Sequence, residues 1–578
     1  MSARKIPFDE VQIIVSSNKL RQYPSAKKGK SRLLPYARPQ ITNNTKIPVG
    51  GTFFVVGNCF ARNIEKSLGR AGRTFLSSPN DLDLPGSAME QYGRYNIFNL
   101  DVSTNEIEWV RDPDGKKRDS ALIEVEGEWV DMQIHWTFAH PEKEAKKFRR
   151  VYNGGYAKIY EADTVIVSVS GITQWFDKQA DHYMNIMPTR RMTQDSPDRF
   201  ELHQFDVEAC ADSLRRFCDL VLKNSTKNPM ILVVVSPVSQ PAVLSTEDAL
   251  IDQTLAKSTQ RVAAQLICDE YERVEYLPFL ESALLSDFRY AYRDSSPNHT
   301  TQGFANRVVA DMLLSYEGPS EGATLLGAIG HTEALLFAKD FEGAIAYAKT
   351  AIKDGVRSDE LDLLYDKALR GAGQHAISID YLIDQLSAGV VIDPERHMRE
   401  VLNLSKNIAT ADQIDKFRQY LKVANLDEKP LNEMLVKRHN SAGVKGANAE
   451  ALITLKGAAR EQCFADVIEQ GKALLEAKDP LDSAGTEIVL VLMSQAMSKD
   501  QDHSKAVDLL LEQAEKYGPL TTRLVQTLVN LAKFHADITS LNAILKLQEI
   551  KNDPIARNLL TARLEKLKLI ASNEKKAI

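Results

Sequence analysis

The sequence predicts a two-part protein: an α/β domain built on a parallel sheet, followed by an all-α region of helical repeats. Short, nearly unbroken apolar runs alternate with helical patterns through the first half of the chain. Such runs are typical of strands buried on both faces of a parallel sheet. From about residue 321 onward, strand-like runs give way to helical periodicity with charged faces. A chain of 578 residues is long enough for two or more domains.

The composition narrows the functional class. With 43% hydrophobic and 26% charged residues, the chain is an ordinary globular protein, and its net charge of −6 provides no overall attraction to nucleic acid or anionic membranes. No apolar run reaches the roughly 20 residues that span a bilayer, and the N-terminus lacks the apolar segment of a secretory signal. The five cysteines include no CxxC pair, so we expect a reducing cytoplasm. Because no His/Asp cluster has ligand spacing, we expect no metal. We also expect no cofactor.

Three segments follow from these patterns. Residues 1–50 form a poorly periodic arm with a basic cluster near Lys27, residues 51–318 the α/β domain, and residues 319–578 the helical region. A solvated arm is the simpler interpretation of the first segment. Contact with substrate or with the domain surface is the alternative.

Gly51–Gly72 is the stretch around which the α/β domain is organised. An apolar run over 53–56 predicts a buried strand, Gly57–Cys59 a tight turn, and the residues from Phe60 an amphipathic helix. This layout places Cys59 at the N-terminal end of the helix, at the sheet edge where open α/β sheets bind ligands. A helix N-terminus stabilises an anion, so we expect a lowered thiol pKa and a functional nucleophile. The alternative is a small cysteine that fills space in the core.

Further strands are predicted along the domain. They lie at Thr164–Val169, Met230–Val235 and Val274–Leu277. Two shorter runs, Ile107–Val110 and Leu122–Val125, flank a Pro-Asp-Gly turn and predict a hairpin. Turns of small or polar residues end three of the long strands: GNC, SGITQ and SPV. Because parallel strands present their carboxyl ends at one edge, these turns predict a common site.

A histidine near the end of the domain completes this candidate site. His299 lies in a polar loop just before a predicted helix, and Asp294 stands five residues upstream. Asp294 would bind the ring's Nδ1–H and leave Nε2 to accept a proton from a nucleophile. The alternative is a surface histidine in a turn that Asp294 begins.

The order of these motifs resembles the GSCFA-domain family over roughly Gly51–Tyr316. The motifs are an apolar strand with GNCFAR, then NIFN, VIVSVSGITQW, VVVSPV, VEYLP and DFRY followed by Asp and His. The resemblance implies an SGNH-hydrolase-like domain, which is a flavodoxin-like α/β sandwich. Its nucleophile would follow the first strand and its histidine would lie near the domain's end.

Several positions depart from the family pattern. Asn58 stands where the family's name motif has Ser; if that Ser were the nucleophile, the chain would be inactive. If the motif's cysteine instead replaces the serine of the Gly-Asp-Ser motif in related hydrolases, Cys59 is intact. We choose the second interpretation, because a Gly-Asn-Cys start also resembles a bacterial capsule-biosynthesis acyltransferase family. Gln174 replaces an acid, and Ser296 occupies the acid's position in the family's terminal Asp-x-x-His, so Asp294 would substitute.

The resemblance implies an acyl-ester hydrolase or acyltransferase acting on an acylated glycan or related small molecule, in bacterial polysaccharide modification. Cys59 would attack the acyl carbonyl and His299, oriented by Asp294, would act as base. Backbone N–H groups and the Asn96 amide would bind the oxyanion, although Asn99 fits the same role. We assign oxyanion or substrate binding to Gly57, Asn58, Asn96, Gly171, Gln174 and Ser236. The alternative is a non-catalytic binding or scaffold protein with a degenerate domain.

The helical region contains weak repeats. Phe341–Ala348 resembles the second helix of a tetratricopeptide-type unit, and residues 374–379, 464–468 and 504–510 echo it. We expect a solenoid of helical hairpins whose concave surface binds a protein partner. A packed helical cap or an oligomer interface is the alternative.

Overall fold

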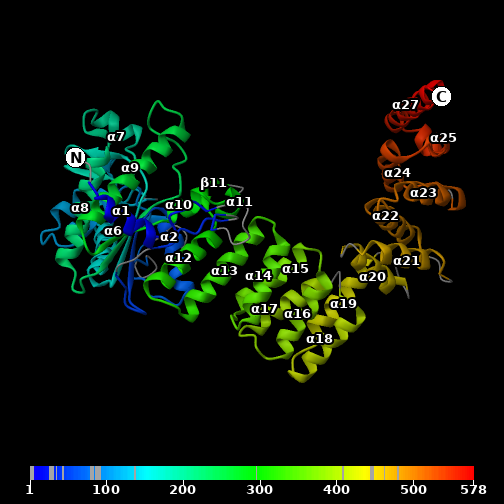
Figure 1. Ribbon diagram of the computed structural model, residues 1–578, viewed down its shortest axis with the longest axis horizontal. Coiled ribbons are helices and arrows are strands. Elements are labelled where there is room, and N and C mark those ends of the chain that lie inside the picture. The colour runs from blue at the N-terminus through cyan, green and yellow to red at the C-terminus, as the bar shows by residue number, and fades with distance from the viewer. Residues whose placement is uncertain are drawn as a thin grey trace. The chain divides into compact units, whose positions relative to one another are not determined.

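The computed structural model describes residues 5–24, 32–33, 36–41, 45–78, 84, 93–135, 138–293, 296–405, 409–442, 448–460, 463–477, 481–517 and 519–577. The chain divides into two compact units, Met1–Arg357 and Ser358–Ile578 (Figure 1). Every described strand lies in the first unit, and the second is built of helices. The predicted α/β domain followed by an all-α region is therefore confirmed.

A four-stranded parallel sheet forms the centre of the first unit. Its strands are β1 (Phe53–Gly57), β4 (Thr164–Val169), β8 (Met230–Val235) and β9 (Val274–Leu277), in that spatial order. The four long apolar runs of the sequence predict these strands. Every residue of β1, β4 and β8 is buried, because helices cover both faces of the sheet.

Alternate side chains of β1 enter the two cores of this sandwich. Phe53 and Val55 pack in a cluster with residues of α2 (Cys59–Arg70) and α12 (Gln302–Tyr316). Phe54 and Val56 pack in a second cluster with residues of α8 (Val207–Asn224) and α9 (Ala249–Glu270). This two-residue period gives three layers, helix on sheet on helix.

The strand order is that of the flavodoxin-like fold, with its outermost strand reduced to a single bridge. Phe75 pairs in parallel with Phe53, on the side of β1 opposite β4. The Phe53 N–H donates to the Thr74 carbonyl at 2.9 Å, and the Leu76 N–H donates to the Phe53 carbonyl at 2.7 Å. With this short strand counted second, the order reads 2-1-3-4-5.

The prediction of a strand at Ile107–Val110 is wrong. These residues continue or cap helix α4 (Leu100–Trp109). The helix begins there because the Asn99 side chain accepts the Val102 N–H at 3.0 Å.

The predicted hairpin forms farther along the chain. Its strands are β2 (Leu122–Val125), as predicted, and β3 (Glu128–Asp131). The two turn residues, Glu126 and Gly127, have φ values of 55° and 85°, as a two-residue hairpin turn requires. A separate antiparallel sheet, unpredicted, consists of β6 (His182–Met184), β5 (Thr173–Asp177) and β7 (Phe200–Gln204).

The remaining helices and strands complete the first unit. They are α1 (Phe8–Ser17), α5 (Lys116–Asp119), α6 (Glu142–Gly155), η2 (Tyr156–Glu161), α7 (Arg190–Asp195), α10 (Phe279–Leu284), α11 (Phe288–Ala291), β10 (Tyr292–Arg293), β11 (Ser296–Thr300), α13 (Glu321–Phe337) and α14 (Phe341–Lys353). The first unit thus continues past residue 318, where the sequence predicts the domain boundary. Among the described residues, none of the helices combines the length and apolarity needed to cross a bilayer.

The second unit is a succession of helices that pack mainly against helices one or two positions away along the chain. They are α15 (Asp359–Gly371), α16 (His375–Ser387), α17 (Pro394–Ser405), α18 (Ala411–Val423), α19 (Lys429–Ala442), α20 (Asn448–Arg460), α21 (Phe464–Leu475), α22 (Ser483–Lys499), α23 (His503–Tyr517), α24 (Thr522–His535), α25 (Ile538–Ile544), α26 (Gln548–Lys551) and α27 (Pro554–Ala577). Three successive apolar clusters fill the unit, so its packing is local along the chain. A specific tetratricopeptide identity stays a prediction.

Candidate active site

Gly57 ends β1 at a position that requires glycine. Its φ is 140°, a conformation that side-chain-bearing residues rarely adopt. A Cβ there would lie 2.6 Å from the Ser168 carbonyl oxygen and 2.7 Å from the Ser168 Cβ. The close approach of β1 to β4 therefore depends on Gly57, and it fixes where the next residues leave the sheet.

Asn58 joins the end of β1 to the end of β8. It is the N-cap of α2, and its Oδ1 accepts the Phe60 N–H at 3.1 Å. Its buried amide also contacts the Ser236 hydroxyl, with Nδ2 3.2 Å from Oγ. The structure thus brings together two predicted site residues that are 178 positions apart.

Cys59 is the first residue of α2, as predicted, and its side chain is half-buried. The expectation of a lowered pKa is wrong: burial raises the pKa of the Cys59 thiol. The N–H groups of Cys59 and Phe60 and the charges of Arg293 and Lys257 act in the lowering direction, but the loss of solvation is larger. The thiol is therefore protonated at neutral pH and needs a base to become a nucleophile.

His299 lies in a short strand rather than in the predicted loop. It belongs to β11, which pairs with β10 directly before α12. Its Nδ1 lies 2.8 Å from the Ser296 hydroxyl and 3.0 Å from the Asn298 Oδ1. Asp294, the predicted orienting acid, lies outside the described residues. Ser296, which holds the family acid's position in the sequence, contacts the ring.

The Asn298 side chain indicates the tautomer of His299. Its Nδ2 donates toward the Ser239 carbonyl at 3.5 Å, so the acceptor Oδ1 is the atom that faces the imidazole. Nδ1 then carries the proton and Nε2 is left as an acceptor. Burial and, secondarily, the nearby Arg293 charge lower the pKa of His299, which favours this neutral form.

Residues 236–239 connect the two candidate catalytic residues. Asn58, the neighbour of Cys59, contacts Ser236, and Asn298, the neighbour of His299, bonds with Ser239 through side chain and backbone. Arg293 acts electrostatically on both the Cys59 thiol and the His299 ring. Segments from opposite ends of the domain thus meet at the carboxyl edge of the sheet.

Lys257 is a site residue that the sequence analysis missed. The side chain is buried on α9, and its Nζ donates to the Val238 carbonyl at 2.7 Å and the Ser170 carbonyl at 3.3 Å. Burial lowers the pKa of Lys257 to about 7, and only the negative charge that Cys59 carries when ionised acts in the opposite direction. One turn later, Gln260 Nε2 donates to the Gly171 carbonyl at 2.6 Å. Helix α9 thus holds the turn that follows β4.

The remaining predicted residues differ in their surroundings. Asn96 is half-buried, and its Oδ1 has no hydrogen-bond partner within the described part of the chain. Asn99, the alternative, caps α4 and donates from Nδ2 to the Met184 carbonyl at 3.1 Å, so it serves the helix. Gln174 is buried in β5 and donates to Asp101 on α4 at 3.0 Å, so its described contact is with α4.

Across the described residues, no three or more His, Cys, Asp or Glu side chains form a group that could hold a metal ion.

Comparison with known proteins identifies the α/β part of the chain. A search of curated proteins found no match. Residues 52–309 match the family model described as the GSCFA family, which confirms the resemblance carried by the motifs from GNCFA to His299.

Proposed function

We propose that the α/β domain is an acyl-ester hydrolase or acyltransferase acting on an acylated glycan or related small molecule. One observation carries the proposal: the chain neighbours of Cys59 and His299 both bond to residues 236–239 at the carboxyl edge of the sheet. General-base catalysis needs a protonated thiol and a neutral imidazole whose Nε2 can accept the proton, and Cys59 and His299 would supply these two groups. The GSCFA match over residues 52–309 supports a hydrolase-like domain.

The proposed reaction has two stages. In the first, Nε2 of His299 takes the thiol proton while the Cys59 sulfur bonds to the acyl carbonyl carbon. The tetrahedral intermediate then expels the ester oxygen, which receives the proton from His299, and a thioester remains. In the second stage, water or a sugar hydroxyl loses its proton to His299 and attacks the thioester carbonyl. The C–S bond breaks, and the proton returns to the Cys59 sulfur.

Backbone amides of the turns would stabilise the negative charge that develops on the carbonyl oxygen. The Cys59 N–H at the start of α2 is the first candidate donor, and the Gly171 N–H is the second. The Asn96 side-chain amide would be a third donor. These assignments, with Gly57, Asn58 and Ser236 shaping the turn around them, belong to the proposal.

Intact-mass analysis tests the proposal directly. The full chain is incubated with a panel of acyl thioesters and acetylated sugars, and we expect one acyl adduct, located on Cys59. Cys59→Ala and His299→Ala should each abolish adduct formation and turnover, and Cys463→Ala should retain both. Turnover that persists in Cys59→Ala or His299→Ala would contradict the proposed roles.

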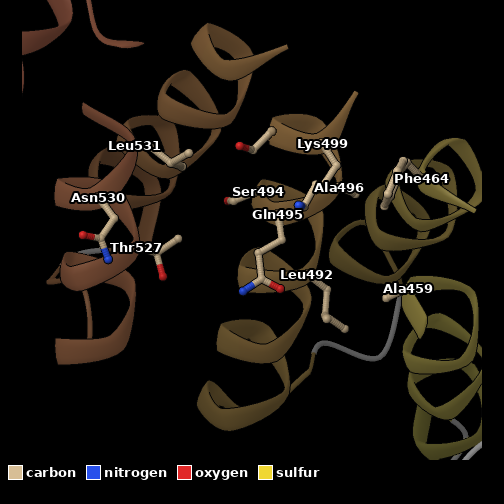
Figure 2. A pocket seen from close by; sticks show the side chains of 11 residues that line it. Ala459, Phe464, Leu492, Ser494, Gln495, Ala496, Lys499, Thr527, Asn530 and Leu531 are labelled. Atoms are coloured by element: carbon tan, nitrogen blue, oxygen red, sulfur yellow. The ribbon is translucent and has the colours of Figure 1, made fainter. Parts of the chain in front are cut away.

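A binding or scaffold protein is the second candidate, and a pocket in the second unit favours it. The pocket has a volume of about 660 Å³. Figure 2 shows Gln495 on α22 and Thr527 and Asn530 on α24 among its lining side chains. Such uncharged polar groups could hydrogen-bond the backbone of a partner peptide. An electrophilic thiol probe separates the two candidates: labelling of Cys59 no faster than of Cys463 would favour binding over catalysis.

A cytoplasmic location is part of the same proposal. The five cysteines, all within the described residues, form no disulfide. Unpaired thiols are usual in a reducing compartment.

A further inference from the structure

A pocket of about 790 Å³ lies beside the candidate active site. It is bounded by the segment after β8, by the N-terminal half of α9, and by helices α10 and α11. Its lining includes Pro237, Gln240, Leu250, Ser258, Leu284 and Phe288. Pockets of 300–1,000 Å³ hold ligands of many non-hydrogen atoms, so this space is far larger than an acetyl group requires.

The pocket is continuous with the residues that surround Cys59 and His299. Pro237 and Ser239 line it, and the residue before Pro237 is the partner of Asn58. Asn298, whose Oδ1 faces the His299 ring, also lines it. On the other side, a Cβ placed on Gly171 would lie 2.7 Å from Gln240 Nε2.

The walls of the pocket are largely apolar and are open to a ligand. Leu250 is 81% exposed, Leu284 62% and Phe288 49%, although all three are large hydrophobic side chains. Single exposed apolar residues are common on protein surfaces, but several that line one cavity indicate a binding site. A hydrocarbon ligand would remove this apolar surface from water.

The two basic residues of the lining, Lys257 and Arg261, do not make the pocket an anion site, and Arg261 is paired with Glu281 at 3.0 Å. Lys257 lines the pocket, but its Nζ is hydrogen-bonded to the Val238 and Ser170 carbonyls. The amine therefore faces the backbone of the sheet edge, and its aliphatic stem is what the pocket can receive.

We propose that this pocket binds the hydrocarbon chain of a medium or long fatty acyl group, with the acyl carbonyl at Cys59. The inference rests on the proposed acyl chemistry and specifies its acyl group, which the proposed function leaves open, as a fatty acyl group. Each buried methylene should contribute about fourfold in affinity, so affinity should rise with chain length until the pocket is full.

Binding without chemistry is measured by calorimetry on the full-length Cys59→Ala protein, titrated with octanoate and dodecanoate. We expect saturable binding, tighter for dodecanoate by more than tenfold. Ser258→Trp, an exposed position on the pocket wall, should weaken dodecanoate binding at least tenfold, and Thr254→Trp provides a second blocking variant. Leu255→Trp, exposed on the same helix but not in the lining, is the control and should bind normally. Absent binding, or equal binding in Ser258→Trp and Leu255→Trp, would overturn the inference.

A second experiment measures turnover by the protein that retains Cys59. Its substrates are acyl thioesters whose acyl groups have two to twelve carbons. The ratio of dodecanoyl to acetyl kcat/KM should fall at least tenfold in Ser258→Trp and stay constant in Leu255→Trp. The two hypotheses fail in different ways. Dodecanoate binding without any acyl adduct on Cys59 would contradict the proposed function but support the assignment of the pocket. An acetyl adduct on Cys59 without dodecanoate binding would support the proposed function but contradict the assignment of the pocket.

Discussion

Replacing Lys257 by methionine should make the stability of the first unit respond differently to pH. The Lys257 side chain is buried on α9, and burial lowers its pKa to about 7. In the unfolded chain an ordinary lysine has a pKa of about 10.4. Below pH 7 the amine is charged in both states, and burial of that charge costs stability. Above pH 7 the folded state releases the proton while the unfolded state keeps it, so the unfolding free energy rises with pH.

The size of the effect follows from these two pKa values. Between them, each pH unit adds about 1.4 kcal/mol to the unfolding free energy of the protein with Lys257. From pH 7.5 to pH 9.5, the integrated gain is about 2.5 kcal/mol, because titration is already under way at the lower limit. Lys257→Met lacks this gain. The variant also loses two hydrogen bonds to the Ser170 and Val238 carbonyls, but that loss is the same at both pH values.

The assay is urea unfolding followed by tryptophan fluorescence, in a Cys59→Ala background so that the nearby thiol does not titrate. All four tryptophans precede residue 358, so the signal reports on the first unit. The unfolding free energy of Lys257→Met minus that of its parent should fall by about 2.5 kcal/mol between pH 7.5 and pH 9.5. Lys223→Met, at an exposed lysine of α8, controls for loss of a positive charge. A difference that does not change with pH would refute the assignment of a neutral, buried amine.

Three further predictions concern the site and its support. Gly57→Ala should lower the unfolding free energy by about 2–4 kcal/mol, because φ is 140° and the Ser168 carbonyl lies 2.6 Å from the added Cβ. Gly72→Ala, with φ of 70° and open space around it, should cost only about 1 kcal/mol in the same denaturation assay. Arg149→Met should lower the unfolding free energy by about 3–5 kcal/mol in the same assay, because it leaves buried Glu106 and Asp131 without their cation. The control, Arg215→Met at the surface, should lower it by less than about 1 kcal/mol. Ser296→Asp should raise the His299 pKa in an NMR titration, because a carboxylate replaces a hydroxyl 2.8 Å from Nδ1; an unchanged pKa would contradict the contact.

The main sheet could be predicted because its strands are apolar on both faces. Val165, Ile166 and Val167 enter alternate cores, so consecutive residues are apolar, and the length of the run suits a strand rather than a helix. The strand predicted at Ile107–Val110 failed because the same kind of short apolar run occurs within a helix. There the decisive signal is the Asn99 cap, eight residues earlier.

Site residues could be predicted where a short stretch of sequence positions them. They could not be predicted where contacts between distant parts of the chain position them. Gly57 and Cys59 are marked by a strand–turn–helix pattern that lies within one stretch of sequence. Lys257 lies in a helix of ordinary composition, and its role comes from carbonyls 19 and 87 positions away. A weak signal exists in the spacing of Lys257 and Gln260, two long polar residues among the buried positions of a helix that also include Ala256, Thr259, Ala263, Ala264 and Ile267.

The neutral partners of His299 fit a sulfur nucleophile better than an oxygen nucleophile. Ser296 and Asn298 can fix the tautomer of the ring, but they bring no negative charge to stabilise an imidazolium. A serine, with its very weakly acidic hydroxyl, would need that help when its proton moves to the imidazole. A cysteine thiol gives up its proton far more readily and is intrinsically more nucleophilic, so a weaker base suffices. In the proposed mechanism, Ser296 at the position of the family's acid and Cys59 after the first strand would therefore act together, because a more easily ionised nucleophile needs a less polarised base.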